Sequence, residues 1–184
     1  DANVRSEKGW EGNELIINND ILVLAAPEIA NLPGWVIGLI AAGGIADGRG
    51  FAAAIMLGAD AVQMGTRFVV ANESIVHENY KDRVIKAKDI DSEVTGMSTG
   101  HPIRVIRNKM TREYLQMEKD GASLDELEQL TLGALRKAVV EGDVMYGSVM
   151  AGQSAGLVHK KESCAEIIQE IMTDAHKLIP NIVD

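Results

Sequence analysis

Two glycine-containing turns, each following a short apolar run, limit most strongly what this chain can fold into. The run Val36 to Ala42 is continuously apolar rather than alternating, which is typical of a strand covered on both faces. Asp47 is placed to cap a helix that continues to about Leu57 and stops at Gly58. Ala61 to Met64 is interpreted as a second buried strand. A strand, a helix and a strand in this order predict an α/β fold with a parallel sheet.

The glycine turns lie where parallel α/β folds bind their ligands. Gly43 and Gly44 end the first strand, and Gly65 and Thr66 end the second, so both turns are expected at the carboxyl edge of the sheet. Glycine lets backbone N–H groups approach a phosphate closely, and a following helix N-terminus favours negative charge. The two turns therefore predict a shared phosphate site, although tight turns and close helix–strand packing explain such glycines equally well.

The composition of the 184 residues narrows the class of protein. Hydrophobic residues make up 46% of the chain, enough for a buried core, and the formal net charge of −9 disfavours nucleic acid as a partner. The apolar stretches fall short of the roughly 20 residues that a membrane helix needs. The lone Cys164 excludes an internal disulfide and suits a reducing cytoplasm. We therefore expect a cytoplasmic protein with no membrane segment.

Five motifs resemble one family of flavin enzymes. Ala41–Gly50 (AAGGIADGRG) and Leu57–Phe68 (LGADAVQMGTRF) closely resemble the flavin-phosphate segment of the FMN-dependent enoyl-acyl-carrier-protein reductase II family and of its relatives, the nitronate monooxygenases. Three further motifs resemble the reductase branch more than the monooxygenase branch: His77–Lys81, Thr99–Arg104 and Glu141–Gly156. The resemblance covers roughly positions 39 to 178.

The resemblance implies the C-terminal part of a (β/α)8 TIM barrel that carries FMN, with a small helical domain inserted after the eighth strand. The expected domains are residues 1–72, a partial barrel with the FMN-phosphate loops; residues 73–154, the helical substrate domain; and residues 155–184, a helix that returns to the barrel. A full barrel takes about 250 residues, so only about three or four of its strands fit here. An open half-barrel exposes apolar edges, from which we expect a homo-oligomer or a truncated product.

The same resemblance implies where the cofactor binds. Carried over position by position, the FMN-binding residues are Ala42, Gly43, Gly44, Met64, Gly65, Thr66 and Gln153. Met150 and Gly152 belong with Gln153 to a segment that returns over the flavin, whereas composition alone favours an ordinary mobile loop there. The family's catalytic histidine aligns with Leu15, so no catalytic residue is assigned. No metal site is expected, because the four histidines lack a ligand spacing.

For function, the resemblance implies an oxidoreductase in which NADH or NADPH reduces FMN, and the flavin then reduces the double bond of a trans-2-enoyl thioester in fatty acid synthesis. The substrate is expected to be linked to acyl carrier protein or to be a small molecule. Two alternatives stay open. One is a nitronate monooxygenase, and the other is a catalytically silent fragment that keeps only a phosphate cradle.

The region from about Glu73 to Asp143 is mostly helical by pattern. Ser123 and Glu126 form a capping box, and the apolar positions after it are expected to form one core face, made of Leu127, Leu130, Ala134, Leu135 and Ala138. Ser163 and Glu166 repeat this arrangement before a second apolar stripe, made of Ile167, Ile168, Ile171, Met172, Ala175 and Leu178.

A basic cluster, two histidines and one cysteine have two interpretations each. A basic cluster is either a solvated helix face or a contact for phosphopantetheine or an acidic carrier protein; it consists of Arg104, Arg107, Lys109 and Arg112, with Tyr114 beside them. His77 and His101 either bond to backbone and solvent or take part in catalysis. Cys164 is either a small apolar filler or a thiol with some thiolate character.

Overall fold

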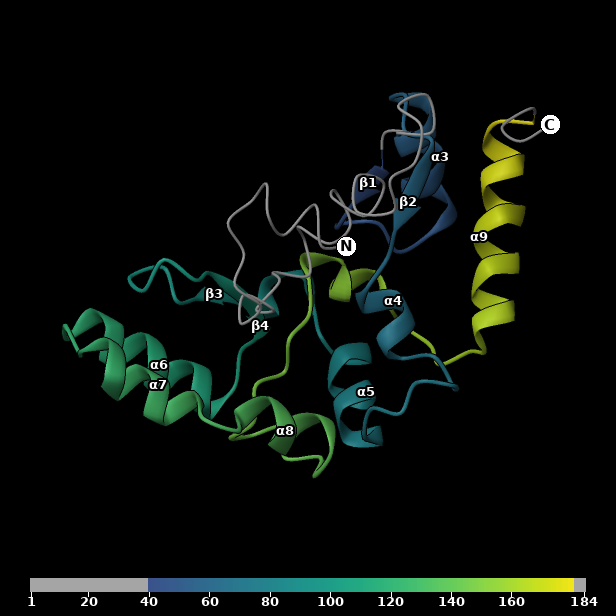
Figure 1. Cartoon of the computed structure of the whole chain (residues 1–184). Helices are drawn as coiled ribbons and strands as arrows, with labels where there is room; N and C mark the ends of the chain where they lie inside the picture. The colour runs from purple at the N-terminus through teal and green to yellow at the C-terminus, as the bar shows by residue number, and fades with distance from the viewer. Residues whose placement is uncertain (1–39, 181–184) are drawn as a thin grey trace, which may run out of the picture.

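A computed structural model of the chain describes residues 40–180, and Figure 1 shows how their elements are arranged. The strands are β1 (Ile40–Ala42), β2 (Ala61–Gln63), β3 (Ser92–Thr95) and β4 (Ile103–Ile106). The α-helices are α3 (Gly48–Met56), α4 (Thr66–Val69), α5 (Glu78–Ile85), α6 (Lys109–Lys119), α7 (Leu124–Thr131), α8 (Ala134–Val139) and α9 (Cys164–Leu178). Two 3-10 helices, η2 (Asp89–Asp91) and η3 (Gln153–Leu157), complete a mixed helix and strand fold. The predicted strand start at Val36 and the Leu15 position lie outside the described residues.

The first unit is the predicted strand, helix and strand. β1 and β2 pair in parallel, with Ile40 opposite Ala61. The Asp47 side chain accepts a hydrogen bond from the Gly50 N–H at 2.8 Å and so caps α3. The helix ends at Met56 with Leu57 as its C-cap, and Gly58 follows with a φ of +98°. The parallel pair and both predicted ends of the helix are therefore confirmed.

The prediction that Ala61 to Met64 forms a buried strand is wrong for this range. Ala61 and Gln63 are exposed, and Val62 is half-buried. Val62 faces residues of α3 and α9, whereas Ala61 and Gln63 point to the opposite face of the sheet, which residues 40–180 leave exposed.

The region after Glu73 is less helical than predicted. β3 and β4 form an antiparallel hairpin in which Ser92 lies opposite Ile106 and Thr95 opposite Ile103. The hairpin turns through Gly96 and Gly100, both at positive φ. Together with α6 and α7 it forms the part of the molecule at the left of Figure 1. The strands have four residues each, too few to give a clear alternating pattern.

The predicted core face after Ser123 is divided between two helices. The Ser123–Glu126 capping box starts α7 as predicted, but α7 ends at Thr131 and Gly133 adopts a φ of +73° before α8. Because of this break, the side chains of α8 do not continue the helical face of α7. Leu127, Ala134 and Ala138 are buried, whereas Leu135 remains 43% exposed. The expectation that Leu135 belongs to the core is therefore wrong.

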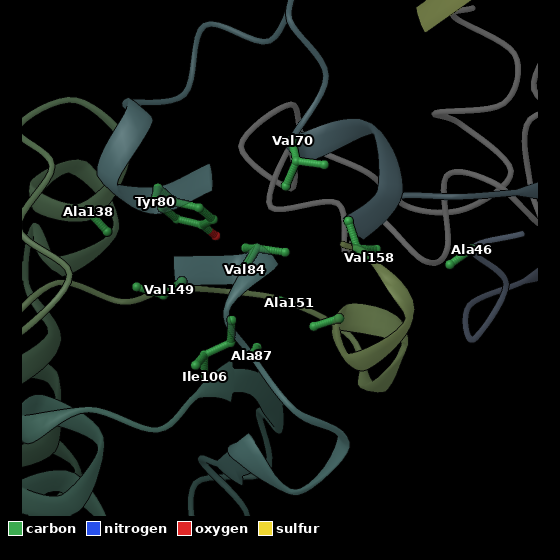
Figure 2. Close-up of a cluster of buried hydrophobic side chains, with 11 residues drawn as sticks. Ala46, Val70, Tyr80, Val84, Ala87, Ile106, Ala138, Val149, Ala151 and Val158 are labelled. Atoms are coloured by element: carbon green, nitrogen blue, oxygen red, sulfur yellow. The ribbon is translucent and has the colours of Figure 1, made fainter. Parts of the chain in front are cut away.

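The main core draws on segments far apart in the sequence. Figure 2 shows this cluster of buried side chains, with the Tyr80 hydroxyl directed towards its middle. Val70 follows α4, Tyr80 and Val84 come from α5, and Ile106 comes from β4. Val149 and Val158 lie on either side of η3, and the remaining members are Ala46, Ala87, Ala138, Ala151 and Ala155. The cluster joins all three expected domains, whose boundaries stay a prediction.

The last helix, α9, packs against α3. Its Ser163–Glu166 capping box forms as predicted, and three residues of its apolar stripe are buried, namely Ile167, Ile171 and Ala175. Ile168 and Leu178 lie at the edge of the stripe and stay more than half exposed. The two helices meet at Gly48, where an added Cβ would lie 2.6 Å from the Ile171 carbonyl oxygen and 2.9 Å from the Ala175 nitrogen.

We expect Gly48→Ala to lower the free energy of unfolding by about 1–3 kcal/mol, because the methyl group meets backbone atoms of α9 that cannot move independently. Gly50→Ala is the matched control. It adds the same methyl group to the same helical turn, but its nearest neighbour is the Ile45 Cγ2 atom at 3.2 Å. Urea unfolding of the two variants tests this prediction, and an equal effect in both would contradict it.

Candidate functional site

The carboxyl ends of β1 and β2 carry glycines whose Cβ positions are open. Gly43 and Gly44 have φ values of +81° and +74°, which favour glycine over other residues. Gly65 differs, because its φ is −93° and any residue adopts that value. Apart from the adjoining residues, no atom of residues 40–180 lies within 4 Å of an added Cβ at any of the three. At Gly65, therefore, neither backbone conformation nor packing within the described range explains the absence of a side chain.

Two backbone N–H groups at these turns have no acceptor among the described residues. Within residues 40–180, the N–H groups of Gly44 and Gly65 donate no hydrogen bond to another residue. Both glycines are exposed. Free N–H groups beside open Cβ positions are the features that backbone-mediated phosphate binding requires.

Two other predicted cofactor residues lie at the same edge. Ala42 is the last residue of β1, and Met64 directly follows β2. The Met64 side chain packs with Phe51, Phe68 and Ile171 and lines an apolar cavity of about 180 Å³ between α3 and α9. Its side chain thus belongs to the core, and only its backbone faces the turn at Gly65.

A second segment reaches this edge from far along the chain. We call residues 148–153 the strap. The Gly152 N–H donates to the Thr66 hydroxyl oxygen at 2.9 Å, across 86 positions of sequence. This bond places Gln153, which is exposed, next to the end of β2. The structure therefore brings the predicted residues of β1, β2 and the strap together.

The strap makes fixed contacts, which favour a structured segment over the interpretation of this stretch as an ordinary mobile loop. The Ile106 N–H donates to the Val149 carbonyl at 2.8 Å, and the Ala151 N–H donates to the Arg104 carbonyl at 3.3 Å. Met150 forms an antiparallel bridge with Val105. Ser148, Val149 and Ala151 are buried. The strap thus lies beside β4 and is joined to it by one isolated antiparallel bridge.

Tyr80 holds the strap from its other side. Its hydroxyl donates to the Met150 carbonyl at 2.6 Å, and its side chain is 3% exposed. Burial raises the pKa of Tyr80, and the hydrogen bond to Met150 lowers it. The effect of burial is the larger one, so the pKa is about 12. The hydroxyl therefore stays protonated, and remains a donor, throughout the neutral range.

The His77–Lys81 motif and the Glu141–Asp143 segment contact one another. The Asn79 side-chain amide donates to the Gly142 carbonyl at 3.0 Å, and the His77 N–H donates to the Val139 carbonyl at 2.8 Å. His77 Nδ1 accepts from the Asn79 N–H and caps α5. An added Cβ at Gly142 would overlap the His77 ring. His77 therefore has a structural role here, while His101 is exposed in the hairpin turn.

The predicted basic cluster does not form one helix face. Arg104 lies on β4 and donates to the Ser92 hydroxyl, and Arg107 pairs with Glu93 at 2.6 Å. The Lys109 ammonium lies 5.3 Å from the centre of the Tyr146 ring. Arg112 is exposed on α6, and Tyr114 is buried. The hairpin between β3 and β4 separates these charges, which the helical interpretation missed.

The surroundings of Cys164 oppose ionisation of its thiol. It begins α9, where its N–H donates to the Glu73 carboxylate. Desolvation, and then the neighbouring Glu73 charge, raise the pKa of the Cys164 thiol. The thiol packs at the edge of the cluster around Ile167, in agreement with its interpretation as a small apolar filler.

Sequence reasoning did not identify Arg67, which follows the turn at Gly65. Its side chain is 5% exposed and pairs with Glu162 and with Glu170, and it also donates to the Lys160 carbonyl at 3.3 Å. Burial of Glu162 opposes its ionisation, but the hydrogen bonds from Lys160 and Arg67 outweigh it and lower the pKa of that carboxyl. The network fastens α4, and with it Thr66, to the start of α9.

Comparison with known proteins identifies the family. The family model for nitronate monooxygenase matches residues 9–174. The chain belongs to the nitronate monooxygenase family. A "probable nitronate monooxygenase" of Staphylococcus saprophyticus is 33% identical over 143 residues, which are 78% of this chain and 40% of that protein. A protein of the same description from Staphylococcus aureus strain JH9 is 39% identical over 121 residues, covering 66% of this chain and 34% of the relative.

Two solved structures are also similar to this chain. FabK from Thermotoga maritima has a TM-score of 0.75 and 48% identity, and the match covers 79% of this chain and 46% of FabK. The nitroalkane oxidase of Streptomyces ansochromogenes has a TM-score of 0.65 and 25% identity, with 80% of this chain and 42% of the oxidase covered. Both neighbours are TIM-barrel oxidoreductases. The chain thus spans less than half the length of these relatives.

Membrane-spanning helices and clusters of metal ligands are both absent from the described residues. Between Ile40 and Pro180 there is no helix long and apolar enough to cross a membrane. In the same part of the chain, no three His, Cys, Asp or Glu side chains are grouped so that they could hold a metal ion.

We expect Glu162→Gln to destabilise the chain by about 1–2 kcal/mol at pH 7, because the buried Arg67 loses its nearest charged partner. Since the pKa of Glu162 in the folded chain lies below its ordinary value of 4.5, this stabilisation is complete above that pH and is lost as the pH falls further. Urea unfolding from pH 7 to pH 3 measures the difference.

Glu141→Gln is the control for this prediction. Its carboxylate lies 3.8 Å from the Arg136 Nε atom. The Arg136 side chain is 73% exposed, and the Glu141 side chain is 55% exposed. Such pairs contribute little, so we expect a change below about 0.5 kcal/mol at every pH. A Glu162→Gln effect that is as small, or that does not depend on pH, would show that the network does not anchor α4.

Proposed function

We propose that this chain provides the FMN-phosphate side of an FMN-dependent oxidoreductase with a TIM-barrel fold. Family membership supports an oxidoreductase of this kind, and the parallel β1–α3–β2 unit supports the barrel. The phosphate would lie against the backbone of Gly43, Gly44, Gly65 and Thr66, with Ala42 and Met64 at the strand ends and Gln153 on the strap. We call this set of seven residues the cradle.

The observation that carries this proposal is the open position at Gly65. A Cβ there would meet no atom of residues 40–180 beyond its chain neighbours and would require no unusual backbone conformation. A glycine is thus accounted for by a ligand that approaches the backbone closely. The N–H groups of Gly44 and Gly65, which donate to no acceptor within residues 40–180, agree in chemistry with a phosphate as that ligand. These N–H groups would bind the phosphate through hydrogen bonds, so the acidic net charge of the chain does not prevent phosphate binding.

The favoured reaction is reduction of an enoyl thioester by NADH or NADPH. FabK, an enoyl-acyl-carrier-protein reductase II, is 48% identical to this chain, against 25% for the nitroalkane oxidase. Bound FMN would supply the hydride chemistry. The described residues would bind the phosphate, orient the cofactor and cover it with the strap. The substrate would be a small thioester or one linked to acyl carrier protein.

Nitronate oxidation is the second candidate, because the matching family model and the curated relatives carry that description. The comparisons give no support to the third hypothesis, a silent fragment. A cytoplasmic location and a homo-oligomer remain part of the proposal. Leu15, at the position of the family's histidine, lies outside the described residues, and the proton donor is left unassigned.

Anaerobic spectroscopy of the FMN-loaded chain distinguishes the two reactions. NADH should bleach the flavin absorbance, and a crotonyl thioester added without oxygen should restore it. Restoration by the thioester supports the reductase. Bleaching by a propyl nitronate in place of NADH, with no response to the thioester, would favour the monooxygenase and overturn the reductase assignment.

We expect Gly65→Val to abolish FMN uptake while leaving the free energy of unfolding within about 0.5 kcal/mol of the wild type, because the added side chain enters only the space assigned to the phosphate. Ala61→Val is the matched control. It adds bulk to an exposed position at the opposite end of β2 and should bind FMN normally. Fluorescence quenching of FMN measures the binding, and normal uptake by Gly65→Val would place the phosphate elsewhere.

A further inference from the structure

The strap has two different edges. The Val149 carbonyl and the Ala151 N–H bond to β4, as in an antiparallel pair. Backbone groups of the residues between and after them point to the opposite side. There the Met150 carbonyl accepts from the Tyr80 hydroxyl at 2.6 Å, and the Gly152 N–H donates to the Thr66 hydroxyl at 2.9 Å. Side-chain hydroxyls therefore take the place of a neighbouring strand at the outer edge.

The two hydroxyls come from different surroundings. Thr66 belongs to the cradle itself and lies in the first turn of α4. Tyr80 lies on α5 within the main core, where it packs in one cluster with Val84, Ala138 and Val149 and has its hydroxyl directed inward (Figure 2). A ring enclosed in this way has little freedom to move, so its hydroxyl is a fixed point for the strap.

We propose that Tyr80 is a positioning residue for the cradle: its hydroxyl fixes the Met150 carbonyl and thereby holds Gly152 and Gln153 at the distance from Thr66 that FMN binding requires. This inference rests on the proposed function. Tyr80 touches no cofactor atom in this account and acts through the strap. The same contact links α5, and with it the His77–Lys81 motif, to the strand ends.

The consequence of losing the hydroxyl follows from the geometry. In Tyr80→Phe the ring still fills its place in the core, but the Met150 carbonyl has lost its buried donor. The strap is then held at β4 and at Thr66 alone, and the segment from Met150 to Gln153 gains freedom. Part of the binding free energy of FMN is spent on ordering it again.

The test compares Tyr80→Phe with Tyr114→Phe. Tyr114 is also buried and also loses one hydroxyl, but it packs in a separate cluster with Met110 and Leu127, and its hydroxyl faces Thr99 rather than the strap. Two quantities are measured on the full chain. One is the dissociation constant for FMN from fluorescence quenching, and the other is deuterium exchange of peptides that cover residues 148–157 and, for comparison, α9.

We expect Tyr80→Phe to weaken FMN binding roughly three- to tenfold, the range for one hydrogen bond, and to speed exchange in the strap but not in α9. Tyr114→Phe should leave both values unchanged. Equal FMN affinity in Tyr80→Phe and wild type, equal weakening in both variants, or unchanged strap exchange would overturn the inference. A wild-type chain that takes up no FMN would instead overturn the proposed function on which the inference rests.

Discussion

The hydrogen bond between the Gly152 N–H and the Thr66 hydroxyl joins two parts of the chain that are 86 positions apart. On one side of it lie β1, β2 and their glycine turns, and on the other lies the strap that returns from the helical region. The strap reaches Thr66 because β4 and Tyr80 hold its two edges, and Thr66 is in place because Arg67 fastens α4 to the start of α9. The candidate site thus depends on core packing well outside the glycine turns.

The family motifs acquire a common physical role in this arrangement. Asn79 and Tyr80 of one motif bond to Gly142 and Met150 of a second motif. Gly152 of that second motif bonds to Thr66 of a third. None of these contacts by itself performs chemistry. They fix the backbone around the strand ends, which is the part of the site that must be rigid if main-chain N–H groups are to bind a phosphate.

Sequence reasoning succeeded where the signals are local. Asp47 and Gly58 mark the start and the end of α3, and the Ser–Glu capping boxes mark the starts of α7 and α9. These predictions succeeded because each signal acts within one helical turn. The β3–β4 hairpin was missed because four-residue strands hold too few side chains to show alternation. The break at Gly133 was missed because the apolar spacing continues across it although the backbone does not. Tyr80 and Arg67 act through partners about 70 and 95 positions away, which no local pattern reveals.

We propose that the turns at Gly43, Gly44 and Gly65 bind the phosphate of FMN through the backbone. The most direct measurement is a titration of the purified chain with FMN and, in parallel, with riboflavin, which carries the same ring system without the phosphate. We expect saturable binding of one FMN per chain and much weaker binding of riboflavin. Equal affinity for the two flavins, or no binding of FMN, would contradict it.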